Sequence, residues 1–389
     1  MTASRLRVVI APDSLKGSLS AAEAAEVIAA GWTSVRPDDE IVLRPMADGG
    51  EGTLEAFLAA HDAEVRTARV VGADGREHDT PWTLLPDGTA VVELGVCCGI
   101  EQLGTARAPF TAHTGGFGQA IAAALDAGAR RLVLGIGSSA STDGGAGMLH
   151  ALGARLLDGD GREVGPALAD ADVDQHGSDP GAAVLPPSGL GGVATVDLSG
   201  LRPAPVGGVL VLSDVTNPLL GARGAAAVFG PQKGIPADHV AEVDAVLSRW
   251  SHAVLSAAGL DDELLTAAGA GAAGGTGFAL KVWGADLVPG AAAVADLIGL
   301  PAATAAADVV ITGEGSYDAQ SAAGKVPAHV ASLSAAAAVL IAGRITPDAD
   351  TSAFAAAISL TQLAGSSDAS LADPRRWLRE AAVAAASRF

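Results

Sequence analysis

Cysteine is almost missing from this chain of 389 residues, and the two that occur, Cys97 and Cys98, are adjacent. Such a pair provides no disulfide framework, and it is interpreted as two small residues at the end of a strand rather than as a redox or metal site. Aromatic residues make up only 3% of the sequence, while alanine and glycine are abundant. This composition favours close-packed α/β layers over a β-sandwich.

Positive charge is also scarce. The chain carries 24 basic against 44 acidic residues, a formal net charge of −20, so nucleic acid and anionic membrane surfaces are not expected partners. No segment reaches the roughly 18 unbroken apolar residues of a membrane helix. The N-terminal residues lead directly into a strand-like run without a signal-peptide pattern, which predicts a cytoplasmic protein.

Lysine is the rarer basic residue: four of the 24 are lysines, Lys16, Lys233, Lys281 and Lys325. All except Lys281 adjoin a glycine in loop-like sequence. A lysine offers a compact charge with three rotatable donors, which suits a moving phosphoryl group. Lys16 and Lys325 are therefore expected to be functional, Lys281 is expected to be structural, and Lys233 is left open between the two.

The order of apolar runs predicts two α/β domains. The first 65 residues alternate strand and helix, with a capping box at Ser20 and Glu23, and this alternation resumes only after residue 292. Between them, three short strands at 66–71, 80–85 and 90–94 predict an antiparallel meander. We expect a Rossmann-like parallel-sheet domain from residues 1–65 plus 292–389, an inserted mixed-sheet domain at 66–291, and an active site in the cleft between the domains. Residues 159–192, rich in Asp, Gly and Pro, are predicted as loop.

The stretch from Arg131 to Leu149 ends an apolar strand in a turn of glycines and hydroxyls and then restarts as a helix. The unpaired N–H groups of such a turn make an anion site. Asp143 lies inside it and would repel a phosphate unless Mg²⁺ lay between the two. The alternative is a glycine-rich turn in which Asp143 is only the helix N-cap.

Four other loops at the carboxyl ends of predicted strands also combine acidic side chains with glycine: PDSLKG at 12–17, MADGGEGT at 46–53, SDVTNPLLG at 213–221, and TGEGSYDAQSAAGKVP at 312–327. Carboxylates for Mg²⁺, lysines for the phosphoryl group and a carboxylate near the acceptor hydroxyl are what metal-assisted phosphoryl transfer needs. The sequence contains no Walker A motif, no protein-kinase motif set and no HExxH zinc motif.

Two other classes of function stay open. Gly135, Gly137 and Ala140, with Asp158 after the next strand, match a dinucleotide-binding fingerprint and would suit a nicotinamide oxidoreductase. A non-catalytic sensor of sugar acids is the other alternative.

The motifs APDSLKGSLSA, MADGGEGT, GSSASTDGGAGML, NPLLG, AVFGPQKG, GAGAAGG and TGEGSYDAQ…GKVP, spread over residues 7–342, closely resemble those of the type I glycerate kinase family. The resemblance implies two α/β domains and the ATP- and Mg²⁺-dependent phosphorylation of D-glycerate, usually to 2-phosphoglycerate and less often to 3-phosphoglycerate. The chain departs from the family pattern at Cys98, Gly115, Phe117, Thr142 and Thr216, so a related hydroxy acid is a possible substrate.

From the loops and the resemblance together we assign provisional roles. The catalytic candidates are Asp214, Lys16, Asp318 and Lys325. The candidates for binding substrate or nucleotide are Asp13, Ser14, Asp48, Ser138, Ser139, Asn217, Glu314 and Gln320. The candidate Mg²⁺ ligands are Asp143, Asp214 and Glu314. The identity of the general base is not predicted, and either a monomer or a homodimer is compatible with the sequence.

Overall fold

The chain divides into two compact units, and each unit is built from segments that are separate in the sequence. The structure is a computed structural model and describes residues 4–165, 187–322 and 325–389. Unit 1 contains Met1–Asp48, Gly52–Asp62 and Pro289–Phe389, and unit 2 contains Gly49–Glu51 and Ala63–Val288. The main changes between units therefore fall at 62/63 and 288/289, where the sequence pattern placed them at 65/66 and 291/292.

Unit 1 is built on a five-stranded sheet with the order β16-β14-β12-β1-β2. All neighbouring strands are parallel, as the alternation of strand and helix predicted. The chain runs outward from β1 in one direction through β2 and in the other through β12, β14 and β16. The strand order thus reverses between β1 and β12, and open α/β sheets bind ligands beyond the carboxyl ends of the strands at such a point. The strands are β1 (Arg7–Ile10), β2 (Glu40–Leu43), β12 (Val309–Thr312), β14 (Ala337–Ala342) and β16 (Ala356–Ser359).

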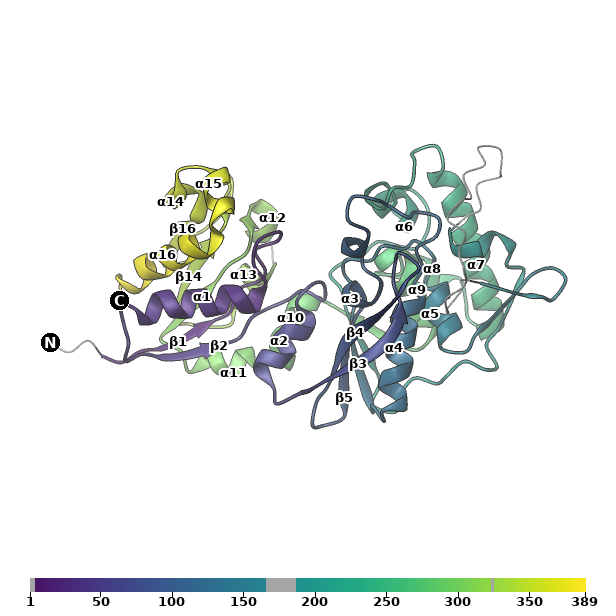
Figure 1. The fold of residues 1–389 in the computed structure, drawn as a ribbon, viewed down its shortest axis with the longest axis horizontal. Helices are drawn as coiled ribbons and strands as arrows, with labels where there is room; N and C mark the ends of the chain where they lie inside the picture. The colour runs from purple at the N-terminus through teal and green to yellow at the C-terminus, as the bar shows by residue number, and fades with distance from the viewer. Residues whose placement is uncertain (1–3, 166–186, 323–324) are drawn as a thin grey trace. The chain divides into compact units, whose positions relative to one another are not determined.

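Helices cover both faces of this sheet (Figure 1). α1 and α16 pack side by side on one face, where Ile28 and Trp32 of α1 and Leu378 of α16 join alternate residues of the strands in one buried core. Ser20 and Glu23 form the predicted capping box at the start of α1. The elements are α1 (Ala21–Thr33), α2 (Thr53–Ala60), α10 (Gly290–Leu297), α11 (Leu300–Ala305), α12 (Ala319–Ala322), α13 (Val326–Ser332), α14 (Leu360–Ala364), α15 (Ser367–Ala372), α16 (Pro374–Ala386) and the paired short strands β13 (Ser316–Tyr317) and β15 (Arg344–Ile345).

Unit 2 is built on a six-stranded mixed sheet with the order β11-β10-β6-β5-β4-β3. β3, β4 and β5 form the predicted antiparallel meander, and β5, β6, β10 and β11 are parallel. A second sheet in this unit has the order β8-β7-β9. The strands are β3 (Glu64–Val71), β4 (Glu77–Leu84), β5 (Thr89–Glu93), β6 (Arg131–Gly135), β7 (Arg155–Leu157), β8 (Glu163–Val164), β9 (Thr195–Asp197), β10 (Val209–Leu212) and β11 (Asp286–Val288).

Unit 2 corrects two sequence-based expectations. Cys97 and Cys98 lie in a short helix, α3, because the chain turns helical directly after β5 and buries both thiols. The predicted loop 159–192 contains β8 and the 3₁₀ helix η2 (Pro187–Gly192), while 166–186 fall outside the described residues. The remaining elements are α3 (Leu94–Cys98), η1 (Ile100–Leu103), α4 (Gly115–Asp126), α5 (Ala146–Ala151), α6 (Ala225–Phe229), η3 (Pro231–Lys233), α7 (Val240–Ala258), α8 (Glu263–Thr266) and α9 (Ala272–Val282).

A helix that crosses a bilayer needs about 20 predominantly apolar residues. α7, the longest helix of the described residues, has 19 residues and carries Glu242, Asp244 and Arg249. Among the described residues, none of the helices combines the length and the apolar character needed to cross a membrane.

Candidate active site

The carboxyl edge of the unit 1 sheet gathers three of the predicted loops. The main-chain N–H of Asp13, after β1, donates to the carbonyl of Gly313 after β12 at 2.8 Å, and Met46 N–H, after β2, donates to Pro12 at 2.8 Å. A Cβ on Gly313 would overlap the carbonyl oxygen of Ile341 in β14, so only glycine allows β12 to end this close to its neighbour. These bonds fix the loops that carry Asp13, Asp48 and Glu314 along one edge.

Asp13 is the most strongly perturbed carboxyl group of this edge. Burial, the charge of Asp48 and that of Glu314 raise its pKa to about 7, although the Ser14 N–H and the Lys16 ammonium act in the opposite direction. The Ser14 N–H donates to Asp13 Oδ1 at 2.7 Å. A carboxyl that titrates near neutral pH suits proton transfer.

Glu314 is the second perturbed carboxyl group. Burial raises its pKa, while a hydrogen bond from Ser321 and the charges of Lys325 and Lys16 lower it. Its Oε1 atom is buried and has no hydrogen-bond partner. Asp318 accepts hydrogen bonds from the Ser321 N–H at 2.9 Å and the Ser321 hydroxyl at 3.2 Å.

The two predicted lysines of unit 1, Lys16 and Lys325, are both exposed, and both act electrostatically on Glu314. Gln320 belongs to α12, and its side chain lies outside what the structure describes. The edge therefore brings together two lysines and four carboxylates: Asp13, Asp48, Glu314 and Asp318.

The carboxylates of the acidic edge are also candidate ligands for Mg²⁺. Mg²⁺ in proteins is usually held by one or two carboxylates together with substrate phosphates, and seldom by a complete protein cage. Within the described ranges, no three Asp, Glu, His or Cys side chains form a ready-made metal group. The unpartnered, buried oxygen of Glu314 beside other carboxylates nevertheless fits a Mg²⁺ ion that arrives with phosphate oxygens.

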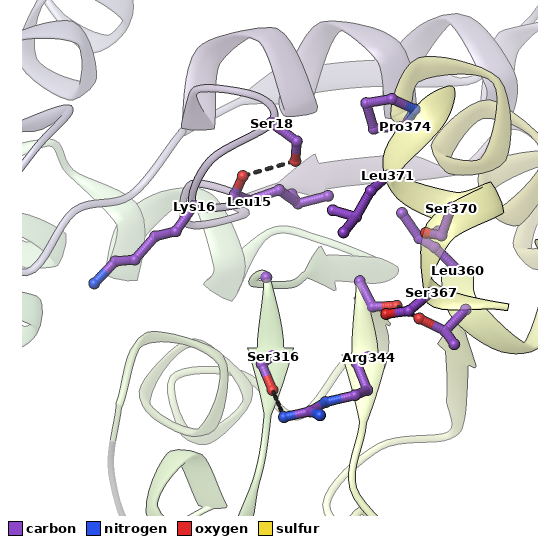
Figure 2. Close-up of a pocket in the computed structure, with 13 residues that line it drawn as sticks. Leu15, Lys16, Ser18, Ser316, Arg344, Leu360, Ser367, Ser370, Leu371 and Pro374 are labelled. Carbon is purple, nitrogen blue, oxygen red and sulfur yellow. Dashed lines mark hydrogen bonds between the residues drawn. The ribbon is translucent and has the colours of Figure 1, made fainter. Parts of the chain in front are cut away.

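A pocket of about 170 Å³ opens at this same edge of unit 1 (Figure 2). The lining includes residues from the segments after four parallel strands: Leu15 after β1, Gly315 after β12, Gly343 after β14 and Leu360 after β16. Helix α15 contributes a further wall. The pocket thus lies where the strand order predicts ligand binding.

In unit 2, the loop between β6 and α5 holds the Asp143 carboxylate through a set of hydrogen bonds. The carboxylate is fully buried and accepts four hydrogen bonds: from Thr114 N–H at 2.8 Å, Thr114 Oγ1 at 2.8 Å, Gly145 N–H at 3.2 Å and Gly147 N–H at 3.1 Å. Three of these bonds end on Oδ2 and one ends on Oδ1, so most of the acceptor capacity of the carboxylate is used within the protein. The N-cap of α5 is Gly145, two residues after Asp143.

Lys233 reaches the same loop from η3. Its ammonium group is buried and donates to the carbonyl of Ser141 at 2.5 Å and to the hydroxyl of Ser139 at 3.2 Å. Burial lowers its pKa to about 8, although the charge of Asp143 acts in the opposite direction. The sequence signals for Lys233 were the scarcity of lysine, the adjacent glycine and the motif AVFGPQKG, and none of them identified the two oxygens that it contacts.

The other predicted residues of unit 2 come from two separate loops and differ in accessibility. Ser138 has a left-handed backbone (φ 58°), and its carbonyl accepts from Ile100 N–H at 2.8 Å. Asp214, after β10, is exposed, and the Asn217 amide donates to the carbonyl of Arg223 at 2.8 Å. Among the positions that depart from the family pattern, Cys98, Gly115, Phe117 and Thr142 are buried and Thr216 is exposed.

Comparison with known proteins agrees with the resemblance of the motifs. The model of the glycerate kinase family matches residues 8–389. Glycerate 2-kinase of Escherichia coli (strain K12) is 39% identical over 350 residues, covering 88% of this chain and 86% of that protein. Glycerate kinase of Bacillus subtilis (strain 168) is 41% identical over 330 residues, covering 84% and 81%.

A solved structure matches the fold as well. A crystal structure from Salmonella typhimurium LT2, which carries the provisional name glycerate kinase 2, has a TM-score of 0.80 and 36% identity, and covers 99% of this chain and 98% of that one. None of these similarities favours a nicotinamide oxidoreductase or a sensor. On the family match and these relatives, the chain belongs to the glycerate kinase family.

Proposed function

We propose that this protein transfers the γ-phosphoryl group of ATP to D-glycerate in a Mg²⁺-dependent reaction and releases 2-phosphoglycerate and ADP. The observation that carries the proposal is the group of carboxylates and lysines at the reversal point of the unit 1 sheet, in a chain of this family. The name of the Escherichia coli relative, glycerate 2-kinase, supports the position of the phosphate.

In this proposal Asp13 is the general base. The oxygen of the substrate hydroxyl forms a bond to the γ-phosphorus while its proton passes to Asp13, and the bond to the ADP oxygen breaks. Lys16 and Lys325 offset the negative charge that the acidic edge and the phosphates bring together. Ser14 holds the carboxylate of Asp13 through its N–H, which makes Ser14 a positioning residue.

Glu314, with Asp318 or Asp48, would hold Mg²⁺, which polarises the transferring phosphoryl group when it is bound. Chelating Mg²⁺ with EDTA should abolish turnover, and excess Mg²⁺ should restore it. Turnover that persists in EDTA would contradict this assignment. Glu314→Gln should raise the Mg²⁺ concentration needed for half-maximal rate, whereas Glu55→Gln, an exposed change in α2, should leave it unchanged.

For unit 2 we propose that Asp214, Asn217 and the Ser138–Ser139 turn serve the same reaction, Asp214 as an exposed acidic side chain at a strand end. Asp143 and Lys233 are positioning residues that keep the turn in shape through the bonds described above.

The direct test is ADP release with D-glycerate as acceptor, with the product identified by adding enolase alone, which consumes 2-phosphoglycerate but not 3-phosphoglycerate. Lys16→Met and Asp214→Asn should each lower kcat about 100-fold, the typical loss when one charged group is removed from a transfer site. Lys281→Met, in α9, is the matched control and should retain the parent rate. The absence of ADP release from the parent protein would refute the activity, and unchanged rates in both variants would refute the residue assignment.

A further inference from the structure

The pocket at the carboxyl edge of unit 1 has walls that glycerate does not need. Leu15 and Leu360 are buried beneath it, and Leu371 and Pro374 border it (Figure 2). D-glycerate carries a carboxylate and two hydroxyls on three carbons, so a leucine wall would desolvate its polar groups without replacing their hydrogen bonds. The leucine walls instead suit a ligand that has a flat apolar surface.

Leu371 supplies an independent observation. It is 62% exposed, and among the large apolar side chains of the described residues only Val206 is more exposed. Leu371 lies on α15 and faces the pocket beside Leu15 in Figure 2. Covering an exposed leucine at the mouth of a pocket removes apolar surface from water, which favours binding of the ligand.

Polar groups also line the same pocket. Arg344 donates from Nη2 to the Ser316 hydroxyl at 3.3 Å, and Ser367 of α15 is exposed. A guanidinium group donates hydrogen bonds, and a hydroxyl can donate or accept, which together match the ring nitrogens and amino group of a heteroaromatic base. The pocket thus combines leucine side chains with polar groups, and small-molecule sites generally combine apolar walls with polar groups that fix the orientation of the ligand.

The size and the direction of Lys16 limit the ligand further. A pocket of about 170 Å³ is smaller than the roughly 300 Å³ at which sites for drug-sized molecules begin, so it accommodates one part of a larger molecule. The Lys16 side chain extends away from the leucines, with its ammonium group at the far end in Figure 2. That ammonium group acts on Asp13 and Glu314. A ligand with a base in the pocket would thus extend its phosphates toward Lys16 and the acidic edge.

We propose that this pocket binds the adenine ring of the nucleotide substrate, with Leu371 as the residue that covers one face of the ring. The inference rests on the proposed kinase function for its choice of nucleotide. It adds a binding residue, Leu371, that no sequence motif indicated.

The test measures binding and turnover separately. Calorimetry with MgATP should give a Kd about tenfold higher for Leu371→Ala than for the parent, because part of a leucine contact is lost. The Kd for inorganic tripolyphosphate should not change, since it has no base. Leu371→Met should restore most of the affinity for ATP. Leu363→Ala, an exposed leucine of α14 outside the pocket lining, is the matched control and should leave both constants unchanged.

In steady-state kinetics, Leu371→Ala should raise KM for ATP about tenfold and leave KM for D-glycerate unchanged. An unchanged Kd for ATP, an equal loss for ATP and tripolyphosphate, or an effect confined to D-glycerate would overturn the proposal, as would a parent protein that binds no ATP. A parent that binds ATP with this dependence on Leu371 but does not phosphorylate glycerate would refute the proposed function and leave the adenine site standing.

Discussion

Asp13→Asn should lower kcat for glycerate phosphorylation by about 10²- to 10⁴-fold, the range for losing a general base. The substitution keeps the size of the side chain and an oxygen that can accept the bond from Ser14 N–H. The expected loss is therefore one of proton transfer, and KM for ATP should change little. Rapid-mixing measurements of product formation in a single turnover would separate this step from product release.

The pKa of Asp13 also predicts how activity and stability change with pH. Since its pKa is raised to about 7, the fraction of base in the active form, and with it kcat/KM, should increase through pH 7 and then level off. The folded pKa exceeds the ordinary value of 3.8, so the folded state binds the proton more tightly. Stability from this group is greatest at low pH and is lost as pH increases toward 7.

At pH 8 and without ligands, the parent must keep Asp13 ionised in a buried position, whereas Asp13→Asn is neutral there. The free energy of unfolding of the variant should then be at least about 1 kcal/mol higher than that of the parent, because each pKa unit corresponds to about 1.4 kcal/mol. Asp38→Asn removes an exposed carboxylate of the same unit, at the opposite end of β2, and should change neither property. An Asp13→Asn variant with parental kcat, or one destabilised at pH 8, would contradict the assignment.

The second large effect is on folding. Asp143→Ala should lower the free energy of unfolding by about 3 kcal/mol or more, because it leaves buried donors of Thr114, Gly145 and Gly147 without an acceptor. For a unit of this size the melting temperature should fall by roughly 6–12 °C. Differential scanning calorimetry measures this fall in melting temperature, and runs with and without Mg²⁺ show whether the ion changes it.

The matched control for Asp143 is Asp79→Asn. Asp79 forms an exposed ion pair with Arg69 at 3.4 Å on the surface of unit 2, and its loss should cost less than about 1 kcal/mol. Asp143→Asn should also destabilise the unit, since an amide presents donors to donors. A stable Asp143→Ala protein that lost only its response to Mg²⁺ would restore the metal role expected from the sequence.

The parallel sheet of unit 1 and the loops at its carboxyl edge could be predicted because both follow from local sequence pattern. Apolar runs such as Val8–Ile10 can be strands buried on both faces, and the carboxyl ends of parallel strands meet at one edge. The hydrogen-bond partners of the loop residues could not be predicted, because they come from distant parts of the sequence. The Asp143 carboxylate is held by Thr114, 29 residues earlier, and the ammonium group of Lys233 contacts Ser141, 92 residues earlier.

Two features were beyond sequence reasoning for a further reason. In the sequence, Leu371 does not differ from other leucines of surface helices. Only its exposure beside the pocket sets it apart from them. Cys97 and Cys98 follow a strand so closely that the hydrophobic pattern continues into α3 without a turn signal. In both cases the role of the residue depends on its burial or exposure in the fold, which the residue type alone does not predict.

The pairing of β1 with β12 has a consequence for synthesis. Val8 faces Val309 and Ile10 faces Ile311, so the first strand has an open hydrogen-bonding edge until some 300 residues have been translated. Unit 2 needs no strand beyond Val288 and can complete its sheets earlier, because its strand partners are all translated by then. The N-terminal segment can therefore pair with β2 early, but its edge toward β12 stays open during most of synthesis. It is the part of the chain for which a chaperone that binds short apolar segments has the longest opportunity.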